Sequence, residues 1–128
     1  DSLPPEISNI STLTFLSLQA YHDDNLYSWI QQLENLEYLS ISGQIGSLNG
    51  ISTLKKLQIL NVYRGSLSSL PAEIGDLDSL KELRITNQSL THLPESIGKL
   101  SQIESIELIG NHIVELPISL CYLKNRRV

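Results

Sequence analysis

The sequence predicts an α/β repeat solenoid, with a parallel β-sheet on its concave side and short helical or 3₁₀ segments on its convex side. Three observations support this fold class. One apolar skeleton recurs at a fixed interval, because Leu57, Leu80 and Ile103 stand 23 positions apart. Each interval opens with a short alternating run of apolar and polar residues, which is typical of a β-strand. Each interval then continues with a Leu-Pro motif and two further apolar residues at the spacing of a helical turn.

Three tandem units carry the skeleton in full. They follow the template L-x-x-L-x-L-x-x-x-x-L-x-x-L-P-x-x-I-x-x-L-x-x. The residues that fill it are Leu57, Leu60, Val62, Leu67, Leu70, Pro71, Ile74 and Leu77; then Leu80, Leu83, Ile85, Leu90, Leu93, Pro94, Ile97 and Leu100; then Ile103, Ile106, Leu108, Ile113, Leu116, Pro117, Leu120 and Leu123. A fixed period between about 20 and 50 residues indicates stacked repeats, which share one core because a single unit cannot bury its own apolar face.

The period continues upstream in altered form. The unit that starts at Leu13 has Asp23 where an apolar residue is expected, and the unit that starts at Leu36 is two residues shorter but regains the skeleton at Leu48, Ile51 and Leu54. We therefore expect one domain over 1–128. It would consist of a partial repeat at 1–12, repeats at 13–35, 36–56, 57–79, 80–102 and 103–125, and a tail at 126–128.

Within a unit, the strand places its residues on alternate sides of the sheet. We expect Leu83 and Ile85 to point into the core, and Glu82, Arg84 and Thr86 to point outward. The proline of the Leu-Pro motif has a fixed φ and no N–H, so it suits the start of a short helical turn or an extended segment just before one.

Two glycines follow the isoleucine of this second half. We expect Gly75 and Gly98 to adopt positive φ, which a residue without a Cβ does readily.

These motifs resemble the leucine-rich repeat family, in its small variant with Leu-Pro-x-x-Ile-x-x-Leu in the second half. Plant intracellular Ras-group proteins, plant immune receptors and many bacterial repeat proteins carry this variant. The resemblance covers nearly the whole chain and implies a right-handed superhelix, but it implies little about function. The family usually has asparagine at the ninth position, where it bonds the backbone of neighbouring turns. Here that position holds Tyr21, Gln44, Gly65, Gln88 and Asn111, so we expect a mixed ladder that uses glutamine or water.

Composition excludes several classes of protein. The 24 leucines and 15 isoleucines, with one phenylalanine, one tryptophan and no methionine, suit a core of identical layers. The single Cys121 rules out an internal disulfide; we expect it to be small and buried, the alternative being a reactive or intermolecular thiol. The net charge of −5 opposes binding to a nucleic-acid backbone, and the terminal KNRRV suits a solvated tail.

No run of residues is apolar for long enough to insert in a membrane, and no leader opens the chain. These features favour the cytoplasm, although a leader removed earlier would allow secretion or a cell-surface location.

Catalytic and metal motifs are not evident. His22, Asp23 and Asp24 form the one cluster that suggests a metal or an acid–base pair, but a solvated turn explains them as well. His92 is expected to lie near Glu115, one layer away. No nucleophile motif, phosphate loop or zinc motif occurs, so we expect neither an enzyme nor a cofactor. The acceptor patterns for N-glycosylation at Asn9 and Asn87 are expected by chance.

Outward residues at equal positions of successive units should form columns across the sheet. The third-position column is Phe15, Tyr38, Ile59, Glu82 and Ser105; the fifth is Ser17, Ser40, Asn61, Arg84 and Glu107; the seventh is Gln19, Ser42, Tyr63, Thr86 and Ile109. The face is thus aromatic and apolar toward the N-terminus and charged toward the C-terminus. Aromatic residues, hydroxyls and arginine are typical of protein-binding hot spots.

The interpretation we favour is a non-catalytic module that binds a protein partner on this concave face. The candidate contact residues are Phe15, Tyr38, Asn61, Tyr63, Arg64, Lys81, Arg84, Glu104 and Glu107. The alternative interpretation is that the aromatic residues only stabilise the sheet, and that Arg84 with Glu107 and Lys81 with Glu104 form ordinary surface ion pairs.

Alternatives stay open. The chain could be the recognition part of a larger effector, ligase or immune receptor, or a structural spacer. No capped end is evident in the sequence, which favours a fragment of a longer protein or association of the ends or sheet edges with another copy.

Overall fold

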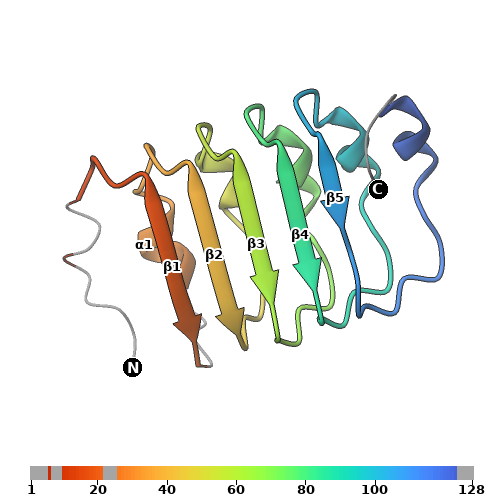
Figure 1. Cartoon of the computed structure of the whole chain (residues 1–128), viewed down its shortest axis with the longest axis horizontal. Coiled ribbons are helices and arrows are strands. Elements are labelled where there is room, and N and C mark those ends of the chain that lie inside the picture. Colours follow the sequence, from red (N-terminus) through yellow and green to blue (C-terminus); the bar gives the residue numbers. More distant parts are fainter. Residues whose placement is uncertain (1–5, 7–9, 22–25, 124–128) are drawn as a thin grey trace.

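A computed structural model shows five β-strands side by side, with one short helical segment behind each (Figure 1). It describes residues 6, 10–21 and 26–123. The elements are β1 (Phe15–Ala20), α1 (Leu26–Ile30), β2 (Tyr38–Gly43), η2 (Ile51–Thr53), β3 (Ile59–Tyr63), η3 (Ala72–Asp76), β4 (Glu82–Thr86), η4 (Glu95–Lys99), β5 (Ser105–Glu107) and η5 (Ile118–Tyr122). All the η elements are 3₁₀ helices. The predicted α/β repeat solenoid is confirmed.

The strands form one parallel sheet in the order β1-β2-β3-β4-β5. The pairing aligns the predicted columns, so that Phe15 pairs with Tyr38, Tyr38 with Ile59, and Ile59 with Glu82. The register holds even across the shortened unit. Its missing residues come from the segment between Gly43 and Ile51, which lies outside the sheet.

The core lies between the sheet and the helical turns. In β4, Leu83 and Ile85 are fully buried whereas Glu82, Arg84 and Thr86 are only partly buried, as predicted. From β2 to β4, the inward residues stack leucine on leucine and valine on isoleucine from layer to layer. Burial of a branched aliphatic side chain contributes about 1.5–3 kcal/mol, so this repeated layer is the main source of stability.

The prolines stand just before the 3₁₀ turns. Pro71 has φ −66° and ψ 150°, which is extended backbone, and η3 begins at the next residue. Pro94 and Pro117 do the same before η4 and η5. Their fixed φ therefore serves the extended segment that leads into each turn.

The prediction of positive φ at Gly75 and Gly98 is wrong, since neither residue is among the positive-φ positions. Glycine is needed at these two positions for space. A Cβ on Gly75 would run into the carbonyl oxygen of Ser96, and a Cβ on Gly98 would lie 2.5 Å from the Cβ of Ser119. The convex turns of successive units thus pack backbone to backbone.

Positive φ occurs instead at Gly50, just before η2, and at the eighth template position, at or beyond the strand ends. Gly43, Arg64, Asn87 and Gly110 occupy one column there, with φ of 103°, 58°, 51° and 74°. Asn87 donates its backbone N–H to the Ile109 carbonyl at 2.8 Å, and Arg64 donates to the Thr86 carbonyl at 3.3 Å. This left-handed turn therefore extends the hydrogen bonds of the sheet by one further rung.

The expected mixed ladder is present in the C-terminal units. Gln88 Oε1 accepts the backbone N–H of Leu67 at 2.9 Å. Asn111 Oδ1 accepts that of Leu90 at 3.2 Å, and its Nδ2 donates to the Ile85 and Leu108 carbonyls. Gln88 thus substitutes for asparagine at the ninth position, in the space that Gly65 leaves open: a Cβ on Gly65 would lie 2.8 Å from Gln88 Oε1.

Cys121 is exposed, so the prediction of a buried residue is wrong. Its position in the template is that of Gly75 and Gly98, where the turn of the following unit packs closely. No such turn packs on Cys121 within the described residues, and its side chain faces solvent.

Candidate functional site

The concave face of the sheet brings most of the predicted contact residues together. Strand pairing places Asn61 beside Arg84, and Arg84 beside Glu107, in one column. Tyr63 belongs to the next column, paired with Ser42 and Thr86. Lys81 and Glu104 directly precede β4 and β5, at the edge where these strands begin. Arg64 lies at the opposite edge, in the turn after β3.

An aromatic stack stands at the N-terminal end of this face. The rings of Phe15 and Tyr38 are 4.4 Å apart between centroids and inclined by only 7°. Phe15 is nevertheless 58% exposed. Because Tyr38 covers one face of the Phe15 ring, this exposure belongs to its other face and its edges. The stack therefore stabilises the pairing of β1 with β2 and also presents an open aromatic surface.

Uncharged polar side chains occupy the rest of the outward face from β1 to β3, further along the strands than the stack. Ser17, Gln19, Ser42 and Asn61 all point outward from β1 to β3 and are exposed or half-buried. Ser40 lies among them and is only 4% exposed. Within the part of the chain that the structure describes, no side-chain hydrogen bond involves any of these residues. This half of the face therefore has hydrogen-bonding capacity that is not used internally.

The charged half of the face is organised around Arg84. Its Nη2 lies 2.5 Å from Glu82 Oε2, and its Nε lies 3.8 Å from Glu107 Oε2. The contact with Glu82 lacks hydrogen-bond geometry, so it is a charge contact. Among the described residues, the alternative pair of Lys81 with Glu104 does not form. The Arg84 side chain is 39% exposed, so its ion pairs contribute about 0–1 kcal/mol to stability.

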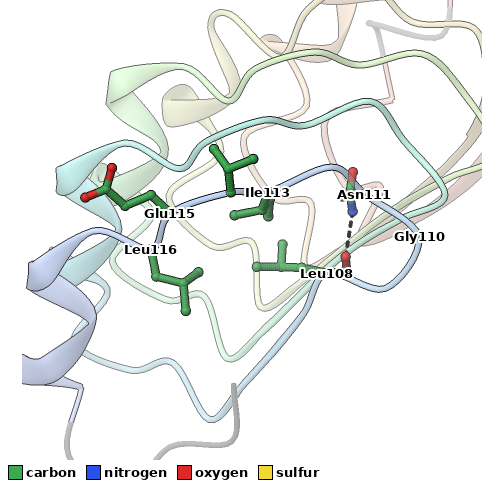
Figure 2. A pocket seen from close by; sticks show the side chains of 7 residues that line it. Leu108, Gly110, Asn111, Ile113, Glu115 and Leu116 are labelled. Carbon is green, nitrogen blue, oxygen red and sulfur yellow. Dashed lines mark hydrogen bonds between the residues drawn. The ribbon is translucent and has the colours of Figure 1, made fainter.

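A hollow of about 400 Å³ lies at the C-terminal end of the described solenoid, beyond β5 (Figure 2). Figure 2 shows Leu108 and Ile113 inside the last turn and the hydrogen bond from Asn111 to the Leu108 carbonyl. Leu116 in its wall is 54% exposed, whereas Leu93, its equivalent one unit earlier, is buried. The last layer is thus apolar but open.

His92 and Glu115 line a smaller hollow of about 320 Å³ next to it. They are neighbours, as predicted, but no hydrogen bond joins them within the described residues. His92 Nδ1 instead lies 3.1 Å from Thr91 Oγ1.

The sequence-predicted metal candidates His22, Asp23 and Asp24 lie outside the described residues, as do Asn9 and the KNRRV segment. No group of three potential metal ligands occurs in 10–21 and 26–123. No helix in the same stretches is long and apolar enough to cross a bilayer.

The fold is closely similar to solved leucine-rich repeat structures. A leucine-rich repeat protein of Leptospira interrogans is 32% identical, with a TM-score of 0.90, and the match covers 97% of this chain and 32% of that one. The chain belongs to the leucine-rich repeat family. The strand-turn-3₁₀ unit, the asparagine or glutamine at the ninth position and the Leu-Pro motif are its family features here.

Two other leucine-rich repeat structures are also similar. An internalin, InlF, of Listeria monocytogenes is 26% identical with a TM-score of 0.80, covering 98% of this chain and 36% of that one. The ectodomain of the plant membrane receptor kinase GASSHO1/SCHENGEN3 from Arabidopsis thaliana, solved in complex with Casparian strip integrity factor 2, is 28% identical with a TM-score of 0.71, covering 96% and 16%. The chain therefore spans about a third or less of the length of these proteins. Neither a family model nor a curated protein sequence matches it.

The sequence was enough to identify the columns of this leucine-rich repeat face, but it did not reveal one property of the face and one of the molecule outside it. It did not single out Ser40, whose near-complete burial depends on the side chains around it. It also did not predict the hollow beside Leu116, which the template places among the apolar positions.

Proposed function

We propose that this leucine-rich repeat chain binds a protein partner on the concave face of its sheet and has no catalytic activity of its own. The observation that carries the proposal is the exposed Phe15–Tyr38 stack beside hydroxyl and amide groups that make no side-chain hydrogen bonds within the described residues. Aromatic anchors with polar neighbours are typical of binding hot spots, and stacked-repeat proteins generally bind through such extended concave surfaces.

The contact residues would have different roles. The aromatic rings would supply apolar contact area, Asn61 would supply hydrogen bonds, and the charged residues would select the orientation of the partner through charge complementarity. The proposed set is Phe15, Tyr38, Asn61, Tyr63, Arg64, Lys81, Arg84, Glu104 and Glu107.

The test is capture of partners from a lysate of the source organism. The native chain is compared with a concave-face variant that combines Tyr38→Ala, Tyr63→Ala and Arg84→Ala, and with a convex-side control that combines Glu73→Ala and Lys99→Ala. Circular dichroism first establishes that all three chains fold. A partner that the native chain and the control retain, and the concave-face variant loses, supports the proposal. Equal capture by all three chains, or none by any, contradicts it and leaves a structural spacer as the better explanation.

A second proposal is that the chain is the recognition part of a larger protein with its catalytic part elsewhere. The observation that favours it is the limited share of the similar proteins that the chain covers. The first proposal includes a single domain over residues 1–128. Under the second proposal, the same residues are one stretch of a longer repeat array. Sequencing the transcript on both sides of the chain separates the two proposals.

A further inference from the structure

We propose that the convex side of the solenoid has a second docking surface, which binds a protein segment that combines apolar side chains with arginine or lysine. This surface, the convex patch, consists of Val114, Ile118 and Tyr122 with Glu95 and Glu115 beside them. It lies behind the sheet, where η4 and η5 stand (Figure 1). None of its residues belongs to a strand, so the inference does not depend on the concave-face proposal.

The template shows that the apolar members of the convex patch stand at outward positions. Val114, Ile118 and Tyr122 hold the twelfth, sixteenth and twentieth positions of their unit. In the two preceding units these positions hold Ser68, Ala72 and Asp76, then Thr91, Glu95 and Lys99, all of them exposed. The turn of a following unit packs on each of these two units. Exposure at these positions is therefore a property of the position and does not depend on whether a later unit is present.

Apolar side chains are unusual at such positions. Val114 is 89% exposed, Ile118 73% and Tyr122 75%, whereas the two preceding units have hydroxyl, charged or alanine side chains there. Val114 lines the hollow of about 400 Å³ and Ile118 lines that of about 320 Å³, and the two hollows share Glu115 and Leu116 in their walls. The exposed apolar groups thus border adjoining hollows. A contiguous apolar surface of this kind marks an interaction site.

Charge identifies the occupant. Glu95 and Glu115 both line the smaller hollow. Glu95 Oε2 accepts the backbone N–H of Ser119 at 3.3 Å, whereas Glu115 has no hydrogen bond or ion pair within the described residues. A cationic side chain placed there meets complementary charge, and an anionic one is repelled. The stems of arginine and lysine also pack along apolar surface, such as that of Ile118, while the charged head stays near the carboxylates.

Other charges on this side do not cancel the two carboxylates. Among the described residues in the second halves of the last three units, the acidic ones are Glu73, Asp76, Asp78, Glu95 and Glu115, and the one lysine is Lys99. Lys99 ends η4, whereas Glu95 begins it. Lys55 reaches the Asp76 carbonyl at 2.8 Å and so lies at η3. Lys124, Arg126 and Arg127 lie outside the described residues. His92 also lines the smaller hollow, and its protonation would oppose a cation, so binding is measured at pH 8.

The probe is a phage-displayed library of random peptides about a dozen residues long. The library is first depleted on a chain with Val114→Thr and Ile118→Ala, which introduce the residues that Thr91 and Ala72 provide at the same template positions. It is then selected on the native full chain, and enriched peptides are synthesised and titrated by calorimetry. We expect these peptides to contain arginine or lysine next to apolar residues.

Two variants test the two parts of the convex patch. Affinity for the enriched peptides should fall at least about tenfold with the combined Val114→Thr and Ile118→Ala changes, as for hot-spot residues. It should fall at least about fivefold with the combined Glu95→Gln and Glu115→Gln changes, which remove charge but keep an acceptor oxygen. The matched control is the concave-face variant with Tyr38→Ala, Tyr63→Ala and Arg84→Ala, whose affinity should change by less than about twofold because its sites are distant. Circular dichroism establishes that each chain folds.

Several results would overturn this inference. They are no enrichment after depletion, enriched peptides without basic residues, and an affinity that the two glutamine changes leave unaltered. Peptides that lose affinity only with the concave-face variant would also overturn it, and would leave the proposed function intact. Failure of the lysate capture to depend on the concave face contradicts the proposed function and leaves the convex patch to this separate test.

A second copy of the chain is the competing occupant. Sedimentation velocity of the native chain, without peptide, measures self-association over a range of concentrations. We expect no dimer that depends on the convex patch, because a symmetric contact would bring Glu95 and Glu115 of both copies together. A dimer that the Val114→Thr and Ile118→Ala changes abolish, together with no enriched peptide, would overturn the assignment of this surface to a basic partner segment.

Discussion

Replacing Gln88 with leucine should destabilise the solenoid by about 1–3 kcal/mol, the usual cost of a buried donor without a partner. Gln88 is only 3% exposed, and its Oε1 accepts the backbone N–H of the buried Leu67 at 2.9 Å. Leucine fills a similar volume but has no acceptor, so it creates little cavity and leaves that N–H unbonded. The other contact, from Gln88 Nε2 to the Thr86 carbonyl, is 3.5 Å long and adds little.

Urea unfolding followed by circular dichroism measures this loss. With a slope of about 2 kcal/mol per molar urea, a loss of about 2 kcal/mol lowers the midpoint by about 1 M. Gln44→Leu is the matched control, because Gln44 holds the same template position but is exposed and contacts only the exposed Ser66 hydroxyl. The free energy of unfolding of this control should change by no more than about 0.5 kcal/mol. Equal shifts for the two variants would refute the role of Gln88 as the substitute for the family asparagine.

Three further variants test the backbone and the charged half. Arg64→Gly should raise the free energy of unfolding by up to about 1 kcal/mol, since φ is 58° at this residue. Thermal unfolding is compared with that of Arg64→Ala, which loses the same charge but should show no gain in stability. Gly75→Ala should cost about 1–3 kcal/mol in urea unfolding, because its Cβ meets the Ser96 carbonyl; an unchanged midpoint contradicts the close packing. Arg84→Gln should change stability by less than about 1 kcal/mol in the same assay, and a larger loss would mean that its pair with Glu82 is structural.

The sequence was sufficient to predict the sheet, its order and its columns because these depend on a single repeated requirement. Every unit must fill the same layer with branched aliphatic residues, so the apolar positions repeat and the strand register follows from them. Gln88 at the ninth position could be predicted for the same reason, since its amide can reach the backbone groups that an asparagine would reach. Periodicity, in short, predicts whatever the layers have in common.

Features that depend on contact between particular units were harder to predict. Gly75 and Gly98 looked like conformational glycines, yet their role is to let two turns approach closely. Cys121 shares their template position but is exposed, because its surroundings differ from theirs. The pairing of Arg84 with Glu82, two residues away on its own strand, competes with the cross-strand partner Glu107, and spacing alone does not show which contact is shorter.

The irregular units carry the aromatic stack of the proposed binding surface, Phe15 and Tyr38. The units that start at Leu13 and Leu36 depart most from the template, but their strands β1 and β2 pair in full register with each other and β2 with β3. The register survives because the length change lies between Gly43 and Ile51, in the connection outside the sheet. Strand pairing, and not unit length, therefore sets where the outward side chains stand. Changes in the connections can accumulate without moving the face, while changes at its outward positions alter the surface that we propose for partner binding.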